Sequence, residues 1–359
     1  MKIDINELKA AWEIVNGVDT ASGIASSQTA RLVAKGGMLE MSLEGLCSGR
    51  SSCPTDDLAA AWTWYVDRRV ISAFLSASKG KTVSLDRVKD SLIMRCGRQK
   101  ITVVSMADIS GYSDWDPSAS NGTFTLKLSE DFAAELLLHS RYAAKEDDMA
   151  AICLEKGYGM LSSDSFAVNV EHDKGRKASY KIPSLLAGFL SAKGAKEVLI
   201  EKNGAGVRWP NGWLYQPLPV NCVAGYPLKR VATISSDVAS AKPLVKIAAK
   251  ALSEALASLK PYAFGGTDLH VRCLPSKTDG RADLFLDTAS GSAQTGVDAT
   301  WGDPSTSILK WPFERLLPWV DHVAAGEPNI PISCGEKDGL YAFTVKGKKH
   351  RVLVIAGAV

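Results

Sequence analysis

Phe74-Leu-Ser-Ala-Ser-Lys-Gly80 is the stretch that decides the fold, because it recurs as Phe189-Leu-Ser-Ala-Lys-Gly194, roughly one third of the chain further on. Each copy follows an apolar segment with helical spacing. Each also leads into a strand-like run, Thr82-Val-Ser-Leu85 in the first copy and Glu197-Val-Leu-Ile200 in the second. The repeated unit is therefore a helix, a Lys-Gly stop and a strand.

A third, more divergent copy follows the same order of elements. Its helical segment is 316–326, its first strand-like run is Asn329-Ile-Pro-Ile-Ser333, and a longer run covers 340–355. A chain of 38.4 kDa exceeds the size at which a single hydrophobic core keeps growing. The sequence therefore predicts three similar domains, with boundaries at 1–117, 118–238 and 239–359.

The composition is that of an ordinary globular protein, with 46% hydrophobic and 23% charged residues and a net charge of only +3. Such a small net charge does not by itself indicate nucleic-acid binding. Seven scattered cysteines without Cys-x-x-Cys spacing argue against a disulfide framework or a zinc site and favour a reducing cytosol. The acidic N-terminus and the lack of a long apolar run predict an intracellular, soluble protein with no membrane partner.

Local signals predict several individual elements. Asn6 is expected to cap a helix that ends near Gly17. The segment from Ser48 to Pro54 is expected to be a loop, and Ser129 is expected to cap the first helix of the second unit. Lys35-Gly36-Gly37 is expected to form a short hairpin, Asn211-Gly212 is a strong hairpin signal, and the Ser-Ser-Asp run at 235–237 is expected to be a linker.

The third unit is expected to open with a helix from Pro243 to about Leu259. Lys242, Lys246 and Lys250 would then fall at positions i, i+4 and i+8. Like charges at this spacing repel by a few tenths of a kcal/mol per pair. This face is therefore either solvated or in contact with an anion.

No assembled active site can be identified in the sequence. Its paired glycines have the wrong spacing for a phosphate-binding loop, and its five histidines lack metal-ligand spacing. A Gly-x-Ser-x-Gly elbow is also absent. The acidic run Glu146-Asp147-Asp148 could bind a divalent ion, but such a run is more often a solvated corner. The sequence predicts no cofactor, no metal and no enzymatic activity.

Several local patterns point to a known family. They are Gly97-Arg98-Gln99-Lys100, the acidic and aromatic run 106–115, Ser163-Asp-Ser-Phe-Ala-Val168, and Gly225-Tyr-Pro-Leu-Lys-Arg-Val231. Together with the three units, each ordered helix, strand pair, helix and hairpin, they resemble the bacterial DNA polymerase III β subunit, the sliding clamp. The resemblance covers essentially the whole chain.

Two departures from the family pattern accompany this resemblance. Ser163, Asp164 and Ser165 stand where the family has Gly-His-Arg. The tail Val354-Ile-Ala-Gly-Ala-Val359 replaces the usual Met-Pro-Met-Arg. These changes fit a divergent clamp encoded by a virus, such as a phage, or by a plasmid.

The resemblance implies an α+β protein with the DNA-clamp fold, in which each domain has two helices packed on antiparallel sheets. Two chains would form a homodimeric ring around double-stranded DNA. Such a ring acts as a processivity factor in the cytoplasm, at the nucleoid or in a viral host's cytoplasm, and it is not an enzyme. It would bind a DNA polymerase and a clamp loader through short clamp-binding peptides.

The resemblance also implies two sets of site residues. The candidates for DNA contact are the cations expected on the inner helices: Lys9, Arg68, Arg69, Lys79, Arg141, Lys193, Lys242, Lys246 and Lys250. The candidates for a peptide pocket between the second and third domains are Met149, Leu161, Ser163, Phe166, Val231, Thr233, Ile234, Val354, Ile355 and Ala356.

Two other functions remain open at the level of the sequence. One is a repeat-built scaffold for protein interactions that does not bind DNA. The other is a metal-dependent hydrolase that uses the acidic run 146–148. Retention on circular but not linear DNA would separate a clamp from a scaffold, and metal-dependent turnover would identify a hydrolase.

Overall fold

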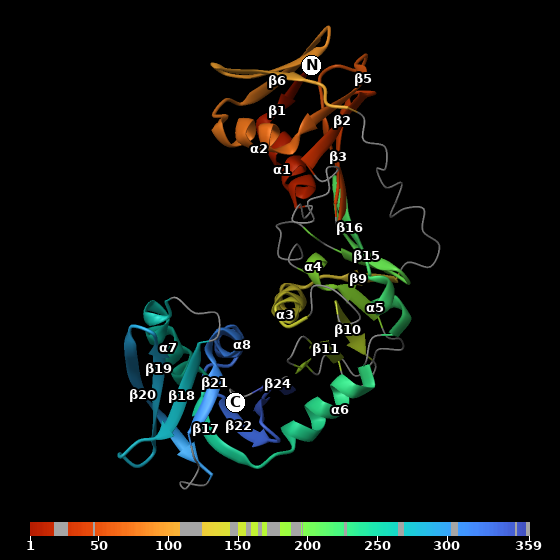
Figure 1. Ribbon diagram of the computed structural model, residues 1–359. Helices are drawn as coiled ribbons and strands as arrows, with labels where there is room; N and C mark the ends of the chain where they lie inside the picture. The colour runs from red at the N-terminus through yellow and green to blue at the C-terminus, as the bar shows by residue number, and fades with distance from the viewer. Residues whose placement is uncertain are drawn as a thin grey trace. The chain divides into compact units, whose positions relative to one another are not determined.

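The described part of the chain divides into two compact units (Figure 1). The computed structural model describes residues 1–17, 28–45, 47–107, 124–143, 150–155, 159–163, 167–170, 180–187, 195, 197–225, 228–264, 269–302, 308–348 and 350–356. Unit one comprises Met1–Ala133 and Leu185–Leu218, and unit two comprises Ala134–Ser184 and Pro219–Val359. Among the described helices, none is both long and apolar enough to cross a membrane.

Among the described residues one motif, a strand, a helix and a three-stranded meander, occurs six times, so each expected domain contains two copies. The first copy comprises β1 (Lys2–Asp4), α1 (Ile5–Asn16), β2 (Thr29–Lys35), β3 (Met38–Glu44) and β4 (Ser48–Pro54). The second comprises β5 (Ala61–Asp67), α2 (Arg68–Ala77), β6 (Thr82–Val88), β7 (Ser91–Cys96) and β8 (Gln99–Val104). The third copy comprises β9 (Phe124–Lys127), α3 (Glu130–Ser140), β10 (Ala151–Glu155), β11 (Gly159–Ser163) and β12 (Ala167–Val170). The fourth comprises β13 (Tyr180–Pro183), α4 (Ser184–Ala187), β14 (Glu197–Glu201), β15 (Gly204–Trp209) and β16 (Gly212–Pro217).

Two helices, α5 (Val220–Gly225) and α6 (Leu228–Ala239), lead into the last two copies. The fifth copy comprises β17 (Pro243–Ala248), α7 (Ala249–Leu259), the short 3-10 helix η2 (Lys260–Tyr262), β18 (His270–Pro275), β19 (Arg281–Thr288) and β20 (Gly291–Trp301). The sixth comprises β21 (Leu309–Pro312), α8 (Phe313–Gly326), β22 (Pro331–Lys337), β23 (Leu340–Lys346) and β24 (His350–Ala356). The expected repeat of helix and strand is confirmed for α2 and for α8. The run 189–194 lies outside the described residues, but the strand expected after it is β14.

The two motifs of each expected domain exchange their first strands. Strand β1 pairs with β6 and β5 pairs with β2, so each meander gains its fourth strand from the other motif. The same exchange joins β9 to β14, β13 to β10, β17 to β22 and β21 to β18. Because each sheet needs both motifs, neither motif can complete its sheet alone.

Two further pairings extend sheets from one expected domain to the next. In unit one β4 pairs antiparallel with β16, and in unit two β12 pairs antiparallel with β24. Both joins follow one rule: the last strand of a domain's first motif pairs with the last strand of the next domain's second motif. The described strands thereby form sheets of four, eight and twelve strands.

Helix α1, expected to end near Gly17, ends at Asn16 and buries Leu8, Trp12 and Val15. The predicted cap, however, is wrong. The carboxylate of Asp4, rather than Asn6, accepts the backbone N–H groups of Asn6 and Glu7 at 2.8 and 3.3 Å. An acidic cap is also favoured by the partial positive charge of the helix N-terminus.

The expected loop 48–54 is also wrong, because it forms strand β4 between β3 and β16. Its buried side chains are small. Ser51 donates a hydrogen bond to the carbonyl of Ala11 on α1 at 2.7 Å, so the helix approaches the strand closely. At Gly212 of β16, an added Cβ would lie 2.5 Å from the carbonyl of Arg50. Small residues are therefore needed here, and they hide the apolar alternation that marks other strands.

The expected helix from Pro243 to Leu259 begins too early. Residues 243–248 form strand β17, and α7 starts at Ala249. Val245 and Ile247 are buried while Lys246 is exposed, which is the two-residue period of a strand. The expected Ser-Ser-Asp linker at 235–237 is likewise part of helix α6.

The twelve-stranded sheet of unit two carries helices on both faces. Phe343 of β23 contacts Trp311 and Trp319, with ring centroids 5.3 and 6.5 Å away, so its side chain points toward α8. Ala342 and Thr344 therefore point to the opposite face, because side chains alternate along a strand. Helix α6 contacts β11, β12, β22, β23 and β24 (Figure 1). We call the face of Ala342 the outer face of this sheet.

Other local predictions are confirmed. Gly36 and Gly37 turn between β2 and β3 with φ of 58° and 78°. Ser129 Oγ accepts the N–H of Phe132 at 3.2 Å, as expected for the cap of α3. The Asn211-Gly212 hairpin joins β15 to β16.

Candidate functional site

The predicted cations of the first expected domain lie on or beside α1 and α2, which pack against each other in unit one. Arg68 donates from Nε to Asn16 Oδ1 at 2.8 Å and from a terminal nitrogen to the Asn16 carbonyl at 3.0 Å. Lys9 Nζ donates to the carbonyl of Ser78 at 3.3 Å. Lys79 follows α2 and is exposed.

Two adjoining hollows bring these cations together. One, of about 450 Å³, is lined by Asn16, Gln28, Arg68, Arg69 and Ser72. The other, of about 280 Å³, shares Asn16 and Ser72 with it and also includes Lys9 and Glu13. We call these hollows the α1/α2 groove. Sequence reasoning missed its neutral polar residues, because nothing in their spacing distinguishes them from surface residues.

Arg69 is the most accessible cation of the α1/α2 groove, with its side chain 78% exposed. It forms an ion pair with Asp67 at 2.6 Å. This hydrogen bond raises the pKa of Arg69 and lowers that of Asp67. An exposed ion pair contributes little to stability, so Arg69 can exchange Asp67 for a phosphate oxygen at small cost.

The remaining predicted cations on helices lie in unit two, where acidic residues are interspersed with them. Arg141 follows α3 and is exposed. Lys250 on α7 lies 3.8 Å from Glu254, four residues further along, and both side chains are exposed. Asp321 on α8 accepts a hydrogen bond from Ser253 of α7 at 2.6 Å. Lys193 lies outside the described residues.

Lys242 and Lys246 do not share a helical face with Lys250, because they precede and occupy β17. Lys246 points away from its buried neighbours Val245 and Ile247, toward the outer face. The register supports this placement, since Lys246 pairs with Ser333 and Ser333 pairs with the outer-face residue Thr344. The structural reason for predicting DNA contact at these two lysines therefore does not hold.

The residues predicted for the peptide pocket have different environments. Val354 and Ile355 of β24 are 2% and 0% exposed, while Ala356 is exposed. Adjacent strand residues point to opposite faces, so Val354 is on the outer face with Ala342, its partner in β23, and Ile355 is not. Leu161 and Ser163 lie in β11, and Val231, Thr233 and Ile234 lie in α6. Met149 and Phe166 lie outside the described residues.

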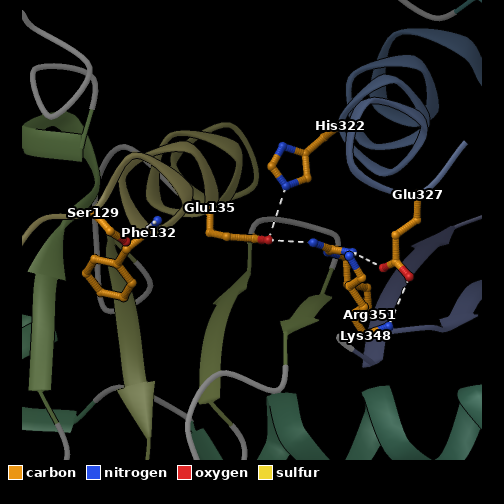
Figure 2. A network of polar contacts seen from close by, with 7 residues as sticks. All are labelled: Ser129, Phe132, Glu135, His322, Glu327, Lys348 and Arg351. Atoms are coloured by element: carbon orange, nitrogen blue, oxygen red, sulfur yellow. Dashed lines mark hydrogen bonds and ion pairs between the residues drawn. The ribbon is translucent and has the colours of Figure 1, made fainter.

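A buried ionic network, which the sequence did not reveal, joins the second and third expected domains within unit two (Figure 2). Arg351 of β24 contacts Glu135 of α3 at 2.7 Å and Glu327, at the end of α8, at 3.4 Å. His322 of α8 lies 3.2 Å from the same oxygen of Glu135. Glu135 and Arg351 are only 1% and 5% exposed.

Opposing effects act on the pKa of Glu135. Burial alone would raise it, because a carboxylate is poorly solvated in the protein interior. The hydrogen bond from His322 and the charge and hydrogen bond of Arg351 outweigh burial and hold the pKa well below its usual range. Glu135 is therefore ionised at neutral pH, and the network is a buried ionic link between α3, α8 and β24.

The described residues contain no group of three or more His, Cys, Asp or Glu side chains arranged to hold a metal ion. The acidic run 146–148, on which the hydrolase alternative rests, lies outside the described residues.

Comparisons with known proteins show similarity in structure but not in sequence. No family model matches the chain, and no curated protein sequence matches it. The DNA polymerase III subunit β of Pseudomonas aeruginosa aligns over 100% of this chain and 99% of its own, with a TM-score of 0.75 and 13% identity. The β subunit of Thermotoga maritima covers 100% and 98%, with a TM-score of 0.76 and 13% identity.

The DNA polymerase sliding clamp of Bacillus subtilis gives a similar result, with coverage of 100% and 98%, a TM-score of 0.76 and 12% identity. An alignment that includes nearly all of both chains covers all six motifs as well as the connections between them. The predicted α+β fold and the resemblance on which it was based are thereby confirmed. The chain has, along its whole length, the fold of the bacterial DNA polymerase III β subunits.

Proposed function

We propose that this protein is a DNA sliding clamp, a processivity factor without enzymatic activity. The observation that carries the proposal is the full-length match of six strand-helix-meander motifs to two DNA polymerase III β subunits and to a protein named a DNA polymerase sliding clamp. In this proposal the chain has three domains, 1–117, 118–238 and 239–359. A clamp works by topology, because a closed ring can slide along a duplex but cannot leave it sideways.

The α1/α2 groove supports DNA contact in the first domain. It gathers Lys9, Arg68 and Arg69 next to neutral hydrogen-bonding groups and one carboxylate, Glu13. Contacts of this kind with phosphates are independent of sequence and depend strongly on salt, as sliding requires. Lys79, Arg141 and Lys250 add exposed charges on or next to helices, and Lys193 remains a candidate. Three cations meet in the α1/α2 groove, whereas Lys250 is accompanied by Glu254 and Asp321 and by no other described cation of this set, so we expect the first domain to dominate the attraction to DNA.

We propose that the ring closes by the same rule that joins the domains. The last strand of a first motif pairs with the last strand of the next domain's second motif, as β4 does with β16 and β12 with β24. In the third domain the corresponding strand is β20, whose residues 291–298 pair with β19 on one side. In the first domain the corresponding edge is β8, where Val104 is 67% exposed.

We therefore assign the dimer contact to β20 of one protomer and β8 of its partner, formed twice in a head-to-tail ring. Unpaired strand edges favour this kind of addition. The ring would act in the cytoplasm, on nucleoid DNA or in the cytoplasm of a viral host.

Partner binding is proposed at the outer face of the twelve-stranded sheet, near α6, β11 and β24. A polymerase and a clamp loader would each insert apolar side chains of a short peptide there. Val354 lies on this face but is buried. Apolar anchors must therefore enter beside α6 or displace it.

The solution mass tests the proposed ring. A sedimentation measurement at micromolar concentration should give about twice the 38.4 kDa of the chain. A species that remains at 38.4 kDa at all concentrations, with or without DNA, would contradict the ring, because a single chain of three domains leaves the outer edges of β8 and β20 without a partner strand.

A further inference from the structure

A basic groove crosses the outer face of the sheet in the third expected domain, beside the end of α6. Its cavity has a volume of about 440 Å³, within the range of about 300–1,000 Å³ that is usual for ligand pockets. Its floor is made of small residues, among them Gly335, Ala342 and Ser333, and its rim carries Lys242, Lys246 and Lys346. We call this cavity the lysine groove.

The residues that precede β17 fix the shape of the lysine groove. A Cβ added at Gly335 would lie 3.1 Å from the carbonyl of Ala241, so the chain between α6 and β17 passes directly over the sheet here. Pro243 and Pro331 make two of its walls rigid. The groove is therefore a built feature of this face.

The three lysines of the groove have no partner among the described residues. None of them forms an ion pair with a described carboxylate. Asp237 of α6 is paired with Lys337 at 2.6 Å, and Glu336 pairs with Tyr341 of β23, on the face opposite the groove. The charge of the groove is therefore not compensated by an ion pair with a described residue.

The spacing of the lysines indicates a ligand with several charges. Lys246 and Lys346 lie two strands and two residues apart, which places their Cα atoms about 12 Å from each other. Lys242 precedes β17, and a register shift between Pro243 and Val245 brings it nearer to Lys246 than four fully extended residues would. One small anion cannot contact all three without drawing like charges together. An extended peptide places the side chains of residues i and i+4 on one side about 13 Å apart, which matches the separation of Lys246 and Lys346.

We propose that the lysine groove binds an extended acidic segment of a protein partner, with carboxylates four residues apart. The charge complementarity and the flat floor of small residues carry this proposal. It does not depend on ring formation or on DNA, and the groove residues differ from those predicted for the clamp-binding peptide pocket.

The test uses the full-length protein and a fluorescein-labelled peptide with the sequence Glu-Ser-Ser-Ser-Glu-Ser-Ser-Ser-Glu. Fluorescence anisotropy at low salt should show saturable binding. The double variant Lys246→Gln, Lys346→Gln should weaken it by about tenfold, since each exposed ion pair contributes a few-fold to affinity. Lys246→Arg with Lys346→Arg should retain it. The matched control, Lys202→Gln with Lys81→Gln, removes the same charge from exposed positions in unit one.

Three results would overturn the proposal: no binding of the peptide, an equal loss in the control, or tighter binding of a single-stranded oligonucleotide that competes with the peptide. The last would identify a nucleic acid as the ligand. Thermal unfolding of each variant separates a lost contact from a lost fold. Failure here would leave the proposed clamp function intact, because the solution mass and DNA retention do not depend on these lysines.

Discussion

Replacing Glu135 by Gln tests the buried network of unit two most sharply. The change keeps the shape of the side chain but removes the negative charge that lies 2.7 Å from Arg351. Arg351 is then buried with a single counterion, Glu327 at 3.4 Å. Breaking a buried ion pair costs about 3–5 kcal/mol, and the remaining counterion favours the lower end, about 3 kcal/mol.

The expected loss is large enough to measure by thermal unfolding. For a unit of this size, about 3 kcal/mol corresponds to a fall in Tm of roughly 6–12 °C. Circular dichroism and calorimetry should show this fall in the transition of unit two. The matched control is Asp287→Asn, which breaks the exposed pair between Asp287 and Arg272 and should cost less than about 1 kcal/mol.

The pH dependence provides an independent check. The pKa of Glu135 is lowered in the folded protein, so its contribution to stability is fully present above its unfolded pKa of about 4.3. The contribution is lost as the pH falls below that value toward the folded pKa. The Tm difference between wild type and Glu135→Gln should therefore be present at pH 7 and shrink below about pH 4. A loss at pH 7 no larger than that of Asp287→Asn would refute the reasoning.

Three further predictions concern the DNA surface, the ring and the core. Arg68→Gln with Arg69→Gln should lower the slope of log affinity for duplex DNA against log salt by up to about 1.8, since each phosphate contact contributes about 0.9. Lys242→Gln with Lys246→Gln should leave the slope unchanged, and equal effects of the two pairs would show that the faces are misassigned. Proline is introduced singly at Ile101 and at Thr102. The substitution that removes the N–H pointing outward from β8 should yield a monomer in sedimentation, and a dimer that survives both substitutions counts against the β8 edge. Ser51→Leu should lower the free energy of unfolding, measured with denaturant, by about 2 kcal/mol, because the side chain is buried against α1. Ser52→Leu should lower it by less than about 0.5 kcal/mol. Similar losses for the two variants would mean that α1 does not pack on β4.

The sequence predicted most of the elements that carry a clear periodicity. The helix at 68–77, the hairpins at 36–37 and 211–212, and the order of elements around α8 all have strong apolar patterns or turn residues. The repeat of the second helix in each domain was visible because Phe74 and Phe189 share their flanking residues. The finer repeat of six motifs was not visible, because it is conserved in strand pairing and not in residue identity.

The errors arose where tertiary contacts override local signals. β4 has buried serines because α1 lies on it, so its pattern does not resemble a core strand. The residues of β17 and α7 share an apolar stripe that fits a helix throughout, and only the alternation of Val245 and Ile247 identifies the strand. Read as one helix, this stripe places the lysines at 242 and 246 on a helical face together with Lys250.

Contacts between distant segments could not be predicted from one sequence. Glu135 and Arg351 are 216 residues apart, and nothing near either residue marks it as buried and paired. The α1/α2 groove likewise depends on Asn16 and Ser72, which are ordinary polar residues until the two helices are brought together.

Retention on DNA of defined topology tests the central claim most directly. The labelled protein is loaded onto nicked circular duplex DNA, with a clamp loader if the ring does not open unaided, and separated from free protein by gel filtration. A sliding clamp should stay with the circle at a salt concentration that abolishes simple electrostatic binding, and should be released when one restriction cut linearises the DNA. Equal retention before and after the cut would contradict the account.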